Sequence, residues 1–114
     1  MCPSRWQRKC PLGKTKTFKP WQIAPWLFVS RDTNGYTDES KERFFAENNI
    51  TRVVCMTKRT TDEYVRTHPT IKWVPLRIND TEVTPEVELQ LNDEVFRILK
   101  EHWTGGATLV HCYG

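Results

Sequence analysis

Blocks of apolar residues along this chain predict a series of strands and helices. Residues 21–30 (WQIAPWLFVS) are apolar and extended, with Pro25 in their middle. Because proline cannot donate a hydrogen bond to a strand ladder, this block predicts two short strands or one bent edge strand. Residues 39–49 (ESKERFFAENN) predict a helix, which Thr37 or Asp38 can cap at its N-terminus.

The middle of the chain predicts two further strands with a short helix between them. Residues 53–56 (VVCM) are continuously apolar, as in a strand of a parallel sheet that is buried on both faces. Residues 60–68 (TTDEYVRTH) predict the short helix. Residues 71–78 (IKWVPLRI) predict a strand near a sheet edge, since Pro75 lies within it. Residues 79–83 (NDTEV) predict a loop.

The longest predicted helix begins after this loop. Thr84 can cap it, Pro85 suits its first position, and two glycines at 105 and 106 end it before a strand at residues 107–111 (ATLVH). Apolar residues recur at helical spacing over a wide arc, which predicts a well-buried helix. These residues are Val87, Leu91, Val95, Ile98 and Leu99, widened by Leu89, Phe96 and Trp103.

The order of the elements predicts an α/β fold. Strands alternate with helices from residue 21 to residue 111, which is typical of a mostly parallel central sheet with helices on its faces. In such folds, ligands bind beyond the carboxyl ends of the strands. The loop at 79–83 and the residues at 112–114 both follow predicted strands, so they are the expected places for a site.

The N-terminal segment differs from the rest of the chain in charge. Residues 1–20 hold six Lys and Arg and no Asp or Glu, whereas the remaining chain holds 11 basic and 14 acidic residues. We expect a disordered basic tail over residues 1–20 and one domain over residues 21–114. An acidic partner or nucleic acid would suit such a tail, and a leader that only increases solubility is the simpler alternative.

Composition further limits the class of protein. No apolar run approaches the roughly 18 residues that span a bilayer, and no apolar export signal is present at the N-terminus. We therefore expect a cytoplasmic or nuclear protein whose four cysteines are reduced thiols. No Cys-x-x-Cys pair occurs and the three histidines are scattered, so no metal site and no other cofactor is expected.

The end of the chain carries the strongest chemical signal. Residues 107–111 predict a strand that places Cys112 at its tip, followed by Tyr113 and Gly114. A cysteine there can pack as a small apolar residue, bind a metal or act as a nucleophile. Backbone N–H groups in a loop that leads to a helix would hold a phosphate group and lower the pKa of the thiol.

The sequence LVHCYG resembles the start of the His-Cys-x5-Arg loop of cysteine-based protein phosphatases. From residue 23 onward the chain is similar to a dual-specificity phosphatase domain, although only the last segment is a specific motif. The similar segments are IAPWLFVS for the opening strands, FFAENNITRVVCMT for the first helix and buried strand, VPLRINDTEV for the general-acid loop and TLVHCYG for the catalytic loop.

The resemblance implies a role for each residue of the site. Cys112 would be the nucleophile, and Asp80, 32 residues earlier, would be the general acid. His111 would tune the thiolate, and the N–H groups of Tyr113 and Gly114 would begin the phosphate cradle. Glu82 is a rival candidate for the acid.

The resemblance also implies elements that these 114 residues do not contain. The arginine of the motif would stand six residues after Cys112, and helices would follow it. We therefore expect a partial three-layer phosphatase fold, cut within the catalytic loop and inactive by itself. One face of the sheet, around Val53, Val54, Leu109 and Val110, is expected to lack its cover.

Three other functions compete with a protein phosphatase that cleaves phosphotyrosine and phosphoserine or phosphothreonine. A pseudophosphatase would bind phosphoproteins without turnover. An RNA 5′-phosphatase would use the same fold. A rhodanese-like sulfurtransferase also places a cysteine between strand and helix, but the spacing of Asp80 and the presence of His111 argue against it.

Overall fold

A computed structural model describes residues 17–56, 62–76 and 84–111 of the chain. The described elements follow the predicted alternation of strands and helices. They are β1 (Trp21–Ala24), β2 (Leu27–Ser30), the 3₁₀ turn η1 (Thr33–Gly35), α1 (Asp38–Glu47), β3 (Ile50–Cys55), α2 (Glu63–Arg66), β4 (Lys72–Pro75), α3 (Pro85–Trp103) and β5 (Ala107–His111).

The strands form one five-stranded sheet in the order β1-β2-β5-β3-β4. β1 and β2 are an antiparallel pair, whereas β2, β5, β3 and β4 run parallel to one another. The prediction of a mostly parallel sheet is therefore confirmed. Of the alternatives left open for residues 21–30, two short strands is correct, and β4 lies at an edge, as Pro75 indicated.

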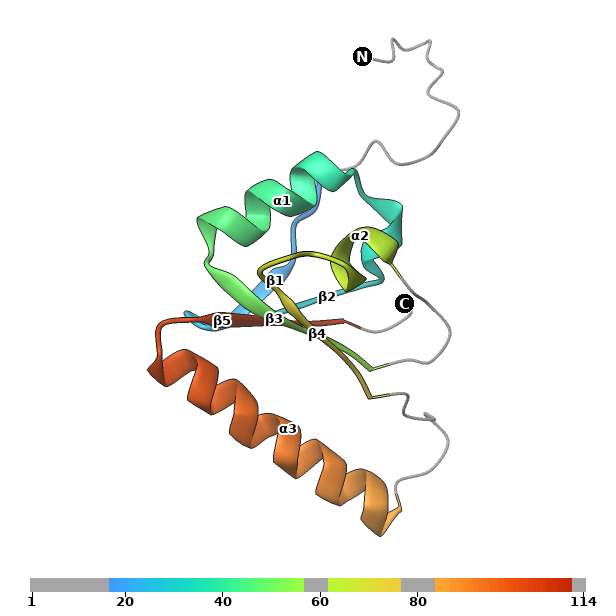
Figure 1. Cartoon of the computed structure of the whole chain (residues 1–114), viewed down its shortest axis with the longest axis vertical. Helices are drawn as coiled ribbons and strands as arrows, with labels where there is room; N and C mark the ends of the chain where they lie inside the picture. Colours follow the sequence, from blue (N-terminus) through green and yellow to red (C-terminus); the bar gives the residue numbers. More distant parts are fainter. Residues whose placement is uncertain (1–16, 57–61, 77–83, 112–114) are drawn as a thin grey trace, which may run out of the picture.

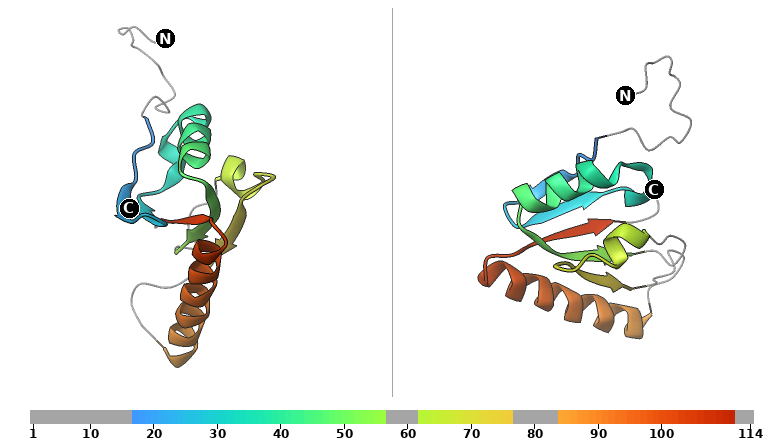
Figure 2. Two further views of the ribbon diagram at one scale, coloured as in Figure 1. Left: turned by 90° about the vertical axis from the view of Figure 1, so that its left-hand side faces the viewer. Right: turned by 45° about the horizontal axis from the view of Figure 1, so that its top comes forward.

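Helices cover both faces of the sheet and make three layers. Figures 1 and 2 show α1 and α2 on one face and α3 on the other. One buried cluster, which includes Phe28, Phe45 and Leu109, lies beneath α1 and α2. A smaller one, formed by Val54, Leu76 and Ile98, lies beneath α3. The predicted three-layer α/β architecture is confirmed.

The helix caps agree with the sequence patterns. The hydroxyl of Thr37 accepts a hydrogen bond from the N–H of Ser40 at the start of α1. The hydroxyl of Thr84 accepts one from the N–H of Val87 at the start of α3. Both bonds satisfy N–H groups that a helix leaves without an internal partner, so these threonines fix where the helices begin.

The folded unit begins earlier than predicted. Phe18 is buried in the cluster beneath α1, where its ring meets those of Tyr36 and Phe44 edge to face. Its N–H donates to the hydroxyl of Ser40, a buried hydrogen bond of 3.1 Å. The prediction that the basic tail extends through residue 20 is therefore wrong for residues 17–20, since a buried aromatic side chain ties them to α1.

The prediction that α3 is well buried is wrong on one flank. Leu89, Phe96 and Trp103 are 63%, 58% and 70% exposed, whereas Ile98 on the sheet-facing side is buried. The apolar arc of α3 is wider than the strip that the sheet covers. In the sheet, Val53, Val54 and Leu109 are buried, whereas Val110 is half-buried. The expected uncovered sheet face is therefore wrong for the first three residues, and Val110 is only partly covered.

We expect this flank to be the main binding place for apolar dyes. Replacing Phe96 and Trp103 by Gln should lower the fluorescence of a bound naphthalene sulfonate dye, because it removes exposed apolar area. The melting temperature should change little, since surface substitutions usually alter stability by about 0.5 kcal/mol or less. Glu88→Gln, at an exposed polar position of the same helix, is the control and should not lower dye binding. Undiminished binding by the double variant would mean that the dye enters elsewhere.

A buried ion pair joins the sheet to α3. Arg52 on β3 donates to Glu94 on α3 at 2.9 Å, and both side chains are about 95% buried. A second guanidinium nitrogen lies 3.5 Å from Glu101. Burying a charge costs free energy unless a partner compensates it, so these residues depend on each other.

Across residues 17–56, 62–76 and 84–111, no helix combines the length and the apolar character that crossing a membrane requires.

Candidate active site at the carboxyl end of the sheet

The carboxyl end of β5 lies in the middle of the sheet, between the ends of β2 and β3. His111, the last residue of β5, is 3% exposed and is paired in register with Ser30 on one side and Cys55 on the other. The carbonyl of His111 accepts a hydrogen bond of 2.9 Å from the N–H of Met56. The backbone is therefore held from both sides up to the residue before Cys112.

A tight connection between α3 and β5 determines where β5 begins. Gly105 has a φ of +96°, a conformation that favours glycine, and the N–H of Gly106 donates to the carbonyl of Glu101 at 2.8 Å. The N–H of Ala107 then bonds the carbonyl of Asn49 at 2.9 Å, which starts the pairing of β5 with β3.

Gly106→Ala should destabilise the fold. A Cβ atom at this position would lie 2.3 Å from the Thr51 hydroxyl oxygen and 3.1 Å from the Thr51 methyl carbon. Turning the Thr51 side chain cannot relieve both contacts, so the start of β5 must shift. Overpacking of this kind costs about 1–3 kcal/mol. Urea unfolding measures the loss, and Thr51→Ala in the same chain should restore most of it. A fully stable Gly106→Ala single variant would contradict this account.

The other predicted site residues fall outside the described ranges. Cys112, Tyr113 and Gly114 follow β5, and Asp80 and its rival Glu82 lie between β4 and α3. Their roles therefore stay predictions. The described residues fix the two ends of the segment that carries Asp80: the N–H of Leu76 bonds the carbonyl of Cys55 at 2.9 Å, and Thr84 caps α3.

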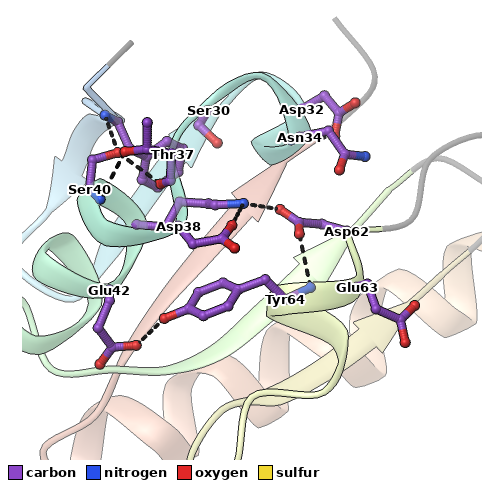
Figure 3. A network of polar contacts seen from close by, with 12 residues as sticks. Ser30, Asp32, Asn34, Thr37, Asp38, Ser40, Glu42, Asp62, Glu63 and Tyr64 are labelled. Carbon is purple, nitrogen blue, oxygen red and sulfur yellow. Dashed lines mark hydrogen bonds and ion pairs between the residues drawn. The ribbon is translucent and has the colours of Figure 1, made fainter. Parts of the chain in front are cut away.

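A polar network that the sequence patterns did not reveal lies at the same end of the sheet (Figure 3). The Lys41 side chain is fully buried, and its Nζ lies 2.6 Å from Asp62 and 3.1 Å from Asp38. Asp62 also accepts a hydrogen bond from the N–H of Tyr64 and so caps α2. Lys41 lies three and four residues before Phe44 and Phe45, so helical spacing places it on the buried face of α1. A lysine on that face needs an acidic partner, but the sequence does not show which acid it is.

The charge of Asp62 is stabilised in the folded protein. Burial raises the pKa of the Asp62 carboxyl, but the hydrogen bond from Lys41 and the positive charge of Lys41, with a smaller contribution from the nearby Thr33, outweigh it. The net effect lowers the pKa below the ordinary value for Asp. The carboxylate therefore contributes stability that is fully present at neutral pH.

This shift predicts how stability depends on pH. Because the folded-state pKa of Asp62 is lowered, its contribution should persist down to about pH 4 and be lost as pH falls through the folded-state value. Asp62→Asn should therefore be less stable than the parent chain at pH 7, with a smaller difference at pH 3. Urea unfolding at both pH values tests this. Asp38→Asn is the control, since the Asp38 side chain is 54% exposed. A deficit for Asp62→Asn that is as large at pH 3 as at pH 7 would refute the linkage.

A second acidic group lies on the outer side of α1. The hydroxyl of Tyr64 donates to the Glu42 carboxylate, and Nε2 of His68 lies 2.7 Å from the same oxygen. The hydrogen bonds from Tyr64 and then His68 lower the pKa of Glu42. A shallow depression here is lined by Asp38, Glu39, Glu42, Arg43 and Tyr64. Its three carboxylates would repel a phosphate group, so this depression is no candidate for the site.

Comparisons with known proteins support the architecture. No protein-family model and no curated protein sequence matches the chain. Among solved structures, that of a human DUSP28 variant is similar, with a TM-score of 0.62 and 18% sequence identity over 82% of this chain. A candidate phosphatase (DUF442) from Shewanella putrefaciens CN-32 is similar with a TM-score of 0.59 and 15% identity over 82% of this chain.

The chain spans only part of either structure, 58% of the DUSP28 chain and 57% of the Shewanella chain. Identities this low show a shared fold and no more. The match nevertheless agrees with the resemblance that the sequence motifs indicated, and with the parallel order of β2, β5, β3 and β4. The described part of the chain thus has the fold of the dual-specificity phosphatases.

Proposed function

We propose that this protein is a cysteine-dependent phosphatase that hydrolyses phosphotyrosine and phosphoserine or phosphothreonine in protein substrates. The observation that carries the proposal is the position of His111. His111 is the last residue of the central parallel strand, at the carboxyl end of the sheet where α/β folds bind ligands. The His-Cys motif begins with this residue. The fold shared with DUSP28 supports the same conclusion.

The proposed reaction has two steps. The Cys112 thiolate attacks phosphorus and forms an S–P bond while the ester P–O bond breaks, and Asp80 gives its proton to the leaving oxygen. Water then attacks phosphorus, the Asp80 carboxylate takes a proton from it, and the S–P bond breaks to release phosphate and the thiolate. N–H groups from Tyr113 onward would hold the phosphoryl oxygens throughout.

Turnover in this scheme needs an arginine six residues after Cys112, which would stabilise charge on the phosphoryl oxygens. We therefore expect the isolated 114-residue chain to hydrolyse no phosphate ester above background. Kinetic tests call for a chain that includes this arginine, which we term the full-length protein.

Substrate class is tested by assaying the full-length protein on matched peptides that carry phosphotyrosine or phosphothreonine, with a 5′-triphosphorylated RNA in parallel. We expect both peptides to be hydrolysed and the RNA to be left intact. Cleavage of phosphotyrosine alone would limit the proposal to a tyrosine phosphatase. Cleavage of the RNA alone would replace it, and tight binding of the phosphopeptides without any turnover would indicate a pseudophosphatase.

A further inference from the structure

The buried charge of Lys41 needs an explanation beyond stability. Lysine is almost never fully buried unless it is paired, and the Lys41 side chain is 0% exposed. Its strongest partner, Asp62, is itself 4% exposed. Apolar residues of similar volume often stabilise a fold as well as a buried ion pair does, or better. A role in holding neighbouring segments in place would explain why the charged residues Lys41 and Asp62 are buried here.

The pair joins segments that follow two different strands. Lys41 lies in α1, which follows β2 after the turn η1. Asp62 begins α2 after β3, and its side chain and backbone fix that helix through bonds to the N–H groups of Tyr64 and Arg66. Thr33 of η1 is fully buried near Asp62 and helps to lower the pKa of the Asp62 carboxyl.

These segments lie on either side of the carboxyl end of β5. In the sheet, β5 is between β2 and β3, so η1 and α1 follow one neighbour of His111 and α2 follows the other. Figures 1 and 2 show η1 and α2 at the end of the sheet toward which β5 points. Figure 3 shows Asp62 and Asp38 gathered between α1 and α2. The ion pair therefore links the two flanks of the strand that ends in His111.

We propose that the Lys41–Asp62 pair is a positioning element for the proposed phosphate-binding loop, because it fixes the segments on both sides of the strand that ends in His111. The inference rests on the proposed function. Neither residue touches substrate in this scheme. Displacements of about 1 Å in a catalytic site can lower the rate 10²-fold. A rigid link between the segments on either side of β5 would therefore help to maintain kcat.

The test uses the full-length protein and a double variant, Lys41→Met with Asp62→Asn. Methionine keeps the apolar length of lysine, and asparagine can still cap α2, so the variant loses the ion pair but not the cap. We expect kcat on a phosphopeptide to fall by about 10-fold to 10²-fold with little change in KM. Lys41→Arg, which keeps the charge, should recover part of kcat.

Two controls separate positioning from general loss of stability. Ile98 of α3 packs on the opposite face of the sheet. Ile98→Ala should lower the stability of the fold but leave kcat unchanged at temperatures where the chain stays folded. The rate at which iodoacetamide alkylates Cys112, followed by peptide mass spectrometry at several pH values, reports the loop without requiring turnover. We expect the double variant to shift this pH profile and Ile98→Ala not to shift it.

The outcomes are distinguishable. A folded double variant with the kcat and the alkylation profile of the parent protein would overturn the inference and leave the proposed function intact. A parent protein without turnover would refute the proposed function, while the alkylation profiles would still show whether the ion pair positions the residues after His111.

Discussion

Cys112→Ser in the full-length protein should abolish turnover while leaving phosphate binding in place. The serine hydroxyl is a much weaker nucleophile than a thiolate, but the substitution does not remove the backbone N–H groups that are proposed to hold phosphate. Asp80→Asn should act differently, because it keeps the nucleophile and removes the proton donor. Its turnover on a phosphopeptide should fall by roughly 10²–10⁴-fold, the usual scale of general acid catalysis.

The dependence on the leaving group identifies the acid. The loss in Asp80→Asn should shrink for a highly activated aryl phosphate, whose leaving group departs as an anion without a proton. Glu82→Gln is the matched control and should show no such dependence. An equal loss on both substrates in Asp80→Asn, or a larger leaving-group effect in Glu82→Gln, would assign the acid to another residue.

Glu94→Ala should cause the largest loss of stability among single substitutions in α3. It leaves the guanidinium of Arg52, 5% exposed, without its partner at 2.9 Å. Breaking one half of a buried ion pair costs about 3–5 kcal/mol, a large share of the roughly 5–15 kcal/mol that keeps a domain folded. Urea unfolding of the parent and variant chains gives the difference directly.

The double variant Arg52→Met with Glu94→Leu is the control for that loss. Removing both charges leaves no buried group unpaired, so its stability should lie close to that of the parent chain. Glu101→Ala should cost less than Glu94→Ala, because Glu101 is 25% exposed and lies 3.5 Å from Arg52. If the double variant is as unstable as Glu94→Ala, the cost arises from lost packing and not from an unpaired charge.

The local patterns of the sequence predict the elements of this fold well. Thr37 and Thr84 cap helices where their side chains can reach free N–H groups, and Pro25 divides the first two strands. The unbroken apolar run at residues 53–56 identifies the buried parallel strand β3, because a strand covered on both faces needs no polar side. Each of these signals depends on neighbours only a few residues apart.

Long-range pairs of charges are what the patterns miss. Arg52 interrupts an apolar strand and so requires a partner, yet its nearest partner, Glu94, is 42 residues away on a helix that carries four other acids. Lys41 and Asp62 are 21 residues apart, and nothing in the local patterns shows that they pair. The burial of α3 is misjudged for a related reason, since apolar spacing shows which arc of a helix is apolar but not how much of it the sheet covers.

The central claim is that Cys112 forms the covalent intermediate. The most direct measurement is to quench the full-length protein with acid during turnover of a phosphopeptide and to locate the phosphoryl group by peptide mass spectrometry. We predict one phosphoryl group on the peptide that contains Cys112, present in the parent protein and absent in Cys112→Ser. A phosphoryl group on a different residue, such as His111, or turnover that persists in Cys112→Ser, would contradict the account.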